Sequence, residues 1–465
     1  MVDSMNNKNN SECYEQSMTR DIRQNTLAGS GKDGKRALDH IDWTFEGVDT
    51  QKYTHGLHNY PARMVPQIVS RLLDFYLTKG IIHEGDLVYD PFAGSGTTLV
   101  ESRLHGLNAE GNDINPFAVM LSKAKSIPLP NAVVNESREY LLDGLQEQLR
   151  TIEQAYSSGE IEGIQLPDVN DGWFPQPQLY QLSAIRDQID AVEEQFGEDV
   201  ARFYRIVLAH TTRKVSYQRN GEFKRYRMSE SDRETHDPDV YSIFTDKLTK
   251  NVQMMRKYAN AVDSSLDTSV HYADSRSATD QVGENKADIV ITSPPYGDHK
   301  TTVAYGEFSQ DPTLLTGEAT YDEMRYVDKE GLGGKNSSLD PMSDLREYSS
   351  SLDKTLEALE NKDGRSEDAL NFFTDYFAVM KEVAKVTKSD QPVIWVVANR
   401  TMSRVSIPAQ LITSELCKHL GYEHVNTLPR EIPNKTLPWE NAPENIPGTK
   451  GELMANENLV VMKAP

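Results

Sequence analysis

Residues 86–114 read DLVYDPFAGSGTTLVESRLHGLNAEGNDI, and this stretch decides the fold class. The apolar segment 86–90 predicts a short buried strand, and 97–106 predicts a helix that ends at Gly106. Residues 108–114 predict a second strand. A strand, a glycine turn, a helix and another strand form the repeating unit of a parallel sheet, so the sequence predicts an α/β fold.

Similar apolar segments continue the sheet towards the C-terminus after a long interruption. We expect strands at 269–274, 287–296, 391–399, 424–432 and 456–464, and covering helices at 64–77, 369–388 and 408–420. Residues 126–268 interrupt this pattern with helical periodicity around 136–156, 178–192, 200–212 and 241–262. The predicted organisation is a flexible tail at 1–42, a catalytic domain at 43–125 and 269–465, a helical insertion at 126–268 and a loop-rich insert at 298–368.

Composition restricts the class of protein. The chain has 465 residues, 71 acidic against 49 basic side chains and a net charge of -22. Such a balance is typical of a solvated acidic surface, and a nucleic-acid binder needs only a positive docking face. Cys13 and Cys417 are too few for a disulfide framework or a cysteine zinc cluster. With no long apolar run and no secretory leader, we expect a cytoplasmic protein.

The glycine turn is the first segment that carries chemistry. Gly94 and Gly96 give the backbone room where a strand turns into a helix, which exposes N–H groups to a ligand. Asp113 ends the next strand, where a carboxylate can accept hydrogen bonds from two ribose hydroxyls. Leu99 stands where a dinucleotide fingerprint has its third glycine, and Asp90 would repel a pyrophosphate. The turn therefore favours an adenosyl cofactor that carries positive charge.

The sequence Thr-Ser-Pro-Pro-Tyr at 292–296 is the second chemical segment, at the end of an apolar strand. Pro294 and Pro295 fix the backbone and remove two N–H donors, so carbonyl acceptors point in a fixed direction. Ser293 adds a hydroxyl, and Tyr296 offers a ring for stacking. Such acceptors can hold an exocyclic amino group with its lone pair directed at an electrophile.

Together, DPFAGSGTT and Ser-Pro-Pro-Tyr resemble the amino-group DNA methyltransferases, which use S-adenosylmethionine to methylate the exocyclic amine of cytosine or adenine. A serine before Pro-Pro-Tyr is typical of the members that make N4-methylcytosine. The segments HGLHNYPARMVP (55–66), YADSR (272–276), IWVVANRT (394–401) and REIPNKTLP (430–438) resemble further motifs of the family. The resemblance implies a Rossmann-like class I fold with a seven-stranded, mostly parallel sheet.

The resemblance also implies roles for individual residues. Asp113 would bind the ribose of the cofactor and Asp274 its adenine amine. The remaining cofactor contacts would come from Tyr60, Asp90, Phe92, Gly94, Ser95 and Gly96. The target amine would be held by Ser293 and the carbonyl of Pro294, followed by Pro295, with Tyr296 stacked on a flipped base. His55 and His58 could ligate one ion, but no third ligand is nearby and the reaction needs no metal.

The DNA-recognition region departs from the family pattern. The family places this region between the motif that contains Asp274 and the motif that begins at Ser293. Here only residues 275–292 separate the two motifs, which is too short for a domain. Recognition must then come from 126–268, from 298–368 or from both. We expect phosphate contacts from the basic run at 211–227, namely from Arg213, Lys214, Arg219, Lys224, Arg225 and Arg227. The segment 297–309, which follows Ser-Pro-Pro-Tyr, should shape the base pocket, with Lys300 or Tyr305 near the nucleic acid.

These motifs favour a site-specific DNA cytosine-N4 methyltransferase whose partners are DNA and, in a restriction–modification system, a cognate restriction endonuclease. An N6-adenine DNA methyltransferase would use the same motifs. An RNA methyltransferase and a non-catalytic regulator that binds S-adenosylmethionine are the remaining alternatives.

Overall fold

The computed structural model describes residues 38–159, 166, 169, 172–219, 224–297, 304–334, 342–432 and 456–465. Seven strands form one sheet with the order β3-β2-β1-β4-β5-β9-β8. Their bounds are β1 Leu87–Asp90, β2 Asn108–Asp113, β3 Thr268–Tyr272, β4 Ile289–Thr292, β5 Pro392–Ala398, β8 Glu423–Glu431 and β9 Asn456–Lys463. All neighbours from β3 to β5 pair in parallel, and β9 is antiparallel to both β5 and β8. The predicted class I sheet is thus confirmed.

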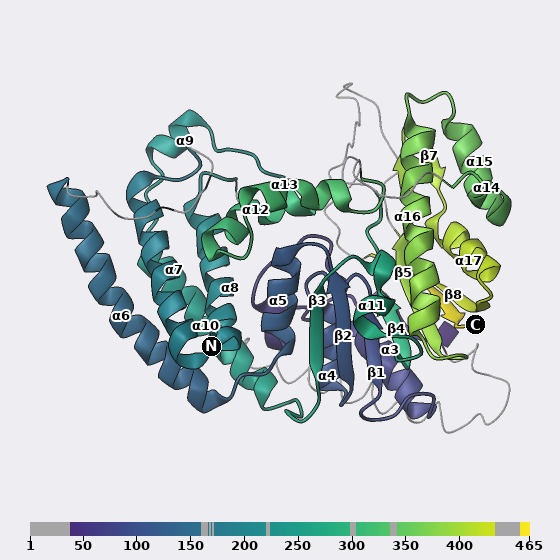
Figure 1. Cartoon of the computed structure of the whole chain (residues 1–465), viewed down its shortest axis with the longest axis horizontal. Coiled ribbons are helices and arrows are strands. Elements are labelled where there is room, and N and C mark those ends of the chain that lie inside the picture. The colour runs from purple at the N-terminus through teal and green to yellow at the C-terminus, as the bar shows by residue number, and fades with distance from the viewer. Residues whose placement is uncertain are drawn as a thin grey trace.

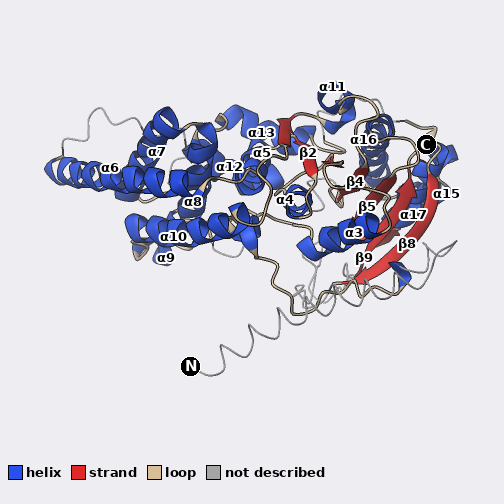
Figure 2. Ribbon diagram, turned by 90° about the horizontal axis from the view of Figure 1, so that it is seen from below, coloured by secondary structure: helices blue, strands red, loops and turns tan. Residues whose placement is uncertain are grey.

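Helices cover both faces of the sheet (Figures 1 and 2), which explains why β4 and β5 are buried along their whole length. Successive side chains of a strand point to opposite faces. Ile394 accordingly packs with α3 (Pro66–Thr78), and the next residue, Trp395, packs with α16 (Arg365–Val386). The helix α17 (Ala409–His419) lies on the α16 side. A small hairpin of β6 (Arg400–Met402) and β7 (Val405–Ile407) was not predicted.

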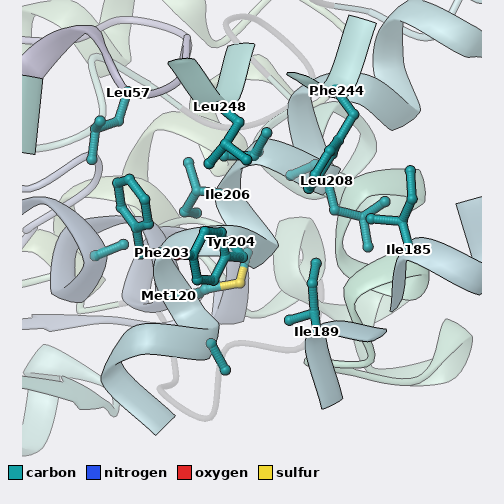
Figure 3. Close-up of a cluster of buried hydrophobic side chains, with 14 of the residues drawn as sticks. Leu57, Met120, Ile185, Ile189, Phe203, Tyr204, Ile206, Leu208, Phe244 and Leu248 are labelled. Carbon is teal, nitrogen blue, oxygen red and sulfur yellow. The ribbon is translucent and has the colours of Figure 1, made fainter. Parts of the chain in front are cut away.

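The residues between β2 and β3 form a helical insertion beyond the β3 edge of the sheet (Figure 1). It contains α6 (Asn131–Ser158), α7 (Gln176–Phe196), α8 (Glu198–Val215), α9 (Glu230–Glu234) and α10 (Val240–Ala259). Four of these helices lie where periodicity predicted them. Met120 of α5 (Pro116–Ser126) packs in one cluster with Ile189, Phe203 and Leu248 of the insertion (Figure 3). This continuous core fixes the insertion to the catalytic domain.

Two predictions about irregular segments were wrong. The described part of 298–368 is largely helical, with α12 (Tyr305–Thr316), α13 (Tyr321–Glu330), α14 (Leu345–Tyr348) and α15 (Ser350–Leu359). These helices are short and stabilised by caps and tertiary packing, such as the capping box at the start of α13, so their periodicity is weak. Residues 1–37 of the predicted tail lie outside the described residues, but Leu38 is 2% exposed and packs in the core.

None of the described helices is long and apolar enough to span a membrane.

Candidate active site

A pocket lies at the carboxyl edge of the sheet, where the ends of parallel strands meet. The ends of β1, β2, β3 and β4 all contribute to its wall. The predicted residues that line it are Tyr60, Asp90, Phe92, Gly94, Ser95, Asp113, Asp274, Ser293, Pro295 and Tyr305. The fold therefore brings both chemical segments to one cavity, although they are separated by nearly 200 residues of sequence.

The glycine turn forms part of the pocket wall. Gly94 and Gly96 have φ of 51° and 78°, a backbone conformation that favours glycine. A Cβ at Gly96 would lie 2.8 Å from the Cβ of Ser122, so a side chain there would also clash with α5. Gly96 precedes the first residue of α4 (Thr97–Leu104), and the Gly94 N–H donates to Asp113 Oδ2 at 2.9 Å. Glycine is thus needed for both the turn and its packing.

Two carboxylates, the buried Asp90 and the half-buried Asp113, give the pocket a negative character. Asp90 Oδ1 accepts hydrogen bonds from Thr292 Oγ1 at 2.6 Å and from Phe92 N at 3.0 Å. Asp113 accepts from Gly94 N and, at 2.8 Å, from Asn115 N. Burial raises the pKa of both carboxyl groups to about 6. Neither forms an ion pair within the described part of the chain, so a cationic ligand would stabilise both.

The turn at 292–296, which follows β4, is anchored to β9 of the same sheet. The Tyr296 hydroxyl donates to Glu457 Oε1 of β9 at 2.9 Å, and Ser293 Oγ lies 3.5 Å from the same hydroxyl. Glu457 also pairs with the buried Arg430 of β8, whose Nε donates to the Trp43 carbonyl at 2.7 Å. Pro294 is buried and Tyr296 is half-buried, and the residues that line the pocket include their neighbours Ser293, Pro295 and Gly297. The sequence offered no local signal for Glu457, because it lies 161 residues from Tyr296.

Stacked aromatic rings form another wall. Tyr60 stacks on Tyr305 with ring centroids 5.7 Å apart and on Phe117 at 6.3 Å. Asn115 Nδ2 donates to the Tyr60 hydroxyl at 3.1 Å. Tyr305 was predicted to contact nucleic acid, but the structure places it in the pocket wall next to a predicted cofactor residue. Burial raises the pKa of both tyrosines, so their hydroxyls stay protonated.

Arg276 organises the remaining side of the pocket. Its guanidinium donates to Asp274 through Nε at 2.8 Å and to the fully buried Asp375 through Nη1 at 2.9 Å. Asp375 in turn accepts from Gly333 N at 2.8 Å, and Arg276 also donates to the Glu330 carbonyl. These bonds hold the segment after α13 against the pocket. Sequence reasoning missed Arg276 and Glu330, although Arg276 lies in the YADSR motif.

Two arginines of the predicted DNA-binding run are internal anchors. Arg225 forms a two-bonded ion pair with Asp311 of α12, with contacts of 3.0 and 2.7 Å, and its guanidinium lies 3.8 Å from the ring centroid of Trp173. Arg213 donates to the Phe308 carbonyl at 2.9 Å and stacks on the Phe308 ring. These contacts fasten the insertion to α12. They occupy both guanidinium groups inside the protein, which the spacing of basic residues could not reveal.

The other basic residues of the run are exposed. Arg219 and Arg227 lie on paired extended segments, because Arg219 N donates to the Tyr226 carbonyl and Gln218 pairs with Arg227. Arg227 also stacks on Trp173 at 4.6 Å. Lys214 and Lys224 are exposed, and Lys300 lies outside the described residues.

The two histidines considered for a metal site serve the segment next to the pocket. His55 Nε2 lies 2.7 Å from Glu101 of α4, and His58 Nδ1 contacts the Asn59 carbonyl. Among the described residues, no group of three or more histidine, cysteine or acidic side chains is arranged to hold a metal.

Comparison with known proteins identifies the family. Residues 65–325 match the family described as D12 class N6 adenine-specific DNA methyltransferase, and residues 3–124 match a family described as DNA methylase. The type II methyltransferase M.MvaI of Kocuria varians is 34% identical over 430 residues, which cover 90% of this chain and 93% of the relative. The chain belongs to the amino-group DNA methyltransferases.

Other type II methyltransferases match over shorter regions. M.MjaII of Methanocaldococcus jannaschii is 30% identical over 176 residues, which cover 37% of this chain and 30% of the relative. M.BsoBI of Geobacillus stearothermophilus is 22% identical over 265 residues, which cover 52% and 49%. The motif-based prediction of an amino-group DNA methyltransferase is confirmed. Methyltransferases of these families use S-adenosylmethionine. The pocket fits a cofactor with cationic sulfur, because Asp90 and Asp113 line it and neither is ion-paired with a residue that the structure describes.

Proposed function

We propose that this methyltransferase transfers a methyl group to the exocyclic N4 amine of cytosine within a specific DNA sequence. The observation that carries the proposal is Ser293, which lines the same pocket as the glycine turn and immediately precedes Pro-Pro-Tyr. A serine at this position is typical of the N4-cytosine members of the family.

The pocket residues have separable roles in this proposal. Asp113 accepts hydrogen bonds from the ribose hydroxyls of the cofactor, and Asp274 accepts one from the adenine amine. The glycine turn and the rings of Tyr60 and Phe92 enclose the rest. Asp90 stabilises the positive charge at the methionine end. The bound cofactor supplies an electrophilic methyl group, and the protein supplies position and electrostatics.

The target amine is held by oxygen acceptors. The Ser293 hydroxyl and the Pro294 carbonyl accept its two N–H bonds, which orients the nitrogen lone pair towards the methyl group. The cytosine must leave the duplex to reach the pocket, so the enzyme flips it. Tyr296 is bound to Glu457 in this structure, and that contact sets the direction of the turn. Stacking of its ring on the base remains part of the proposal.

N6-methylation of adenine is the second candidate, and the match to the adenine-specific family over residues 65–325 favours it. Expression in a methylation-free host, followed by mass spectrometry of the nucleosides, separates the two. We expect N4-methylcytosine from the wild type and none from Ser293→Ala. N6-methyladenine would overturn the choice of base, and the absence of both products would refute DNA methylation by this chain.

The type II relatives favour a role in restriction–modification, with a cognate endonuclease as partner. If so, DNA from the expressing host should resist one restriction specificity and become sensitive again with Ser293→Ala.

A further inference from the structure

Five basic side chains gather beside the pocket on the α8–α10 side. They are Arg63, His210, Lys214, Lys247 and Lys250, here called the basic cluster. Lys214 and Lys250 are exposed, and the other three are half-buried. None of the five forms an ion pair with a described residue. This is unusual in a chain with a net charge of -22, where acidic partners are abundant.

Backbone contacts hold two of these cations together. Lys247 Nζ donates to the Gly56 carbonyl at 3.0 Å, and Arg63 Nη1 donates to the neighbouring His55 carbonyl at 2.9 Å. Both carbonyls belong to the short helix η1 (Tyr53–Gly56). A Cβ at Gly56 would lie 2.7 Å from Met254 of α10, so η1 and α10 are closely packed at this point. Arg63 also lines the pocket, which makes the cluster continuous with the active site.

Helical spacing brings the other members onto the same side. His210 and Lys214 are one turn apart on α8, and Lys247 and Lys250 are three residues apart on α10, so each pair shares a helix face. The two helices face each other closely enough for Lys247, Lys214 and Lys250 to act on His210. The cluster therefore extends across two helices and the loop after η1, rather than surrounding a single point.

The cluster is electrostatically unfavourable in the free protein. Burial and the charges of Lys250 and Arg63 lower the pKa of Lys247 to about 8. Burial and the lysines of the cluster lower the pKa of His210 to about 3. Lys125, which is 1% exposed, has its pKa lowered by burial and by Arg63 and Lys247. Like charges held together without acids are a feature of sites that bind anions.

We propose that the basic cluster binds the sugar-phosphate backbone of the substrate DNA next to the flipped nucleotide. The inference rests on the proposed function, which supplies the polyanion. An extended track of cations suits a row of phosphates better than one small anion, because each phosphate along the strand can meet a separate side chain. Arg63 lines the pocket, which places this track next to the base that enters it.

The test is a double charge reversal of the two exposed lysines, Lys214→Glu with Lys250→Glu. The matched control is Lys354→Glu with Lys362→Glu, which changes two exposed lysines at α15 and just after it, on the opposite side of the molecule (Figure 1). Binding of a fluorescein-labelled duplex of random sequence is followed by anisotropy over a series of salt concentrations. Isothermal titration with S-adenosylmethionine shows that each variant retains its pocket.

The cluster variant should bind the duplex at least tenfold more weakly than the control. The slope of log K against log salt should become shallower by roughly 2, since each phosphate contact contributes about 0.9. An unchanged slope, or an equal loss in the control, would overturn the proposal. The outcomes also separate this proposal from the proposed function. If the wild type methylates no DNA but binds the duplex through the cluster, only the methylation is refuted. If methylation is normal and the cluster variant binds DNA as well as the wild type does, only the role of the cluster is refuted.

Discussion

Replacing Asp90 by asparagine separates the stability of the free protein from cofactor binding. The carboxylate is 2% exposed, and its Oδ1 accepts both the Thr292 and the Phe92 hydrogen bonds. An amide oxygen can accept both, and the amide nitrogen can donate to the Thr98 hydroxyl, which also contacts the carboxylate. Asp90→Asn therefore removes a buried negative charge and keeps the local hydrogen bonds.

The size and sign of the effect follow from the pKa of Asp90. Burial raises this pKa from 3.8 to about 6, so the folded state holds the proton more tightly than the unfolded chain. Below pH 3.8 both states are protonated and the group has no effect on stability. As the pH rises towards 6 the unfolded chain releases its proton first, and above 6 ionisation costs the folded protein about 3 kcal/mol. Asparagine does not ionise, so the folded Asp90→Asn variant lacks this cost.

Thermal unfolding of the free protein between pH 5 and pH 8 measures the difference. At pH 8 the Asp90→Asn midpoint should exceed that of the wild type by about 3 °C, because a chain of this length has an unfolding entropy of about 1 kcal/mol per degree. At pH 5 about half of the advantage should remain. The exposed Asp143 on α6 provides the control, since Asp143→Asn should show no such trend. Affinity for S-adenosylmethionine should fall at least tenfold in the Asp90 variant. A variant less stable than the wild type at pH 8 would refute the reasoning.

Two further substitutions test the anchors around the site. Asp311→Ala leaves the Arg225 guanidinium without its buried carboxylate and should destabilise the protein by about 3–5 kcal/mol. The double variant Arg225→Met with Asp311→Leu should recover most of the loss in unfolding midpoint. Equal midpoints for the single and the double variant would contradict this. Tyr296→Phe keeps the ring but removes the hydrogen bond to Glu457, at a cost of about 1–3 kcal/mol to the catalytic turn. Its methylation rate should fall while cofactor affinity is unchanged, and a wild-type rate would show that Glu457 does not hold the turn.

The parts of the fold that are determined by residues close together in the sequence were predicted well. The unit from β1 through the glycine turn and α4 to β2 was predicted because a buried strand, a glycine turn and an amphipathic helix each have a local pattern. The glycine turn and the Thr-Ser-Pro-Pro-Tyr segment each follow a predicted strand of the parallel sheet. Because ligands bind where parallel strands end, the two segments could be expected at one pocket. The helices of 304–359 were missed because their stability comes from caps and from packing against distant residues.

The errors at the site have a tertiary origin. Arg225 and Asp311 are 86 residues apart, so the basic run could not show that one of its arginines is neutralised inside the protein. Tyr305 looked like a DNA contact because it follows the catalytic turn, but α12 turns it onto Tyr60. Apart from Lys214, the members of the basic cluster were missed for the opposite reason. Its members are scattered between Arg63 and Lys250 in the sequence, and only the packing of η1, α8 and α10 assembles them.

The two charge patterns at the site explain how an acidic chain can use a polyanionic substrate. Asp90 and Asp113 make the cofactor end of the pocket negative, which suits a cationic cofactor and repels phosphate. Arg63 lines the same pocket and begins the positive region, so phosphates are attracted to the side of Arg63 and not to the side of the two carboxylates. The electrostatic screening length in physiological salt is about 8 Å, so the remote acidic surface has little effect on DNA bound beside Arg63. The local sign of the field, rather than the net charge, then determines where the DNA backbone lies and which part of it enters.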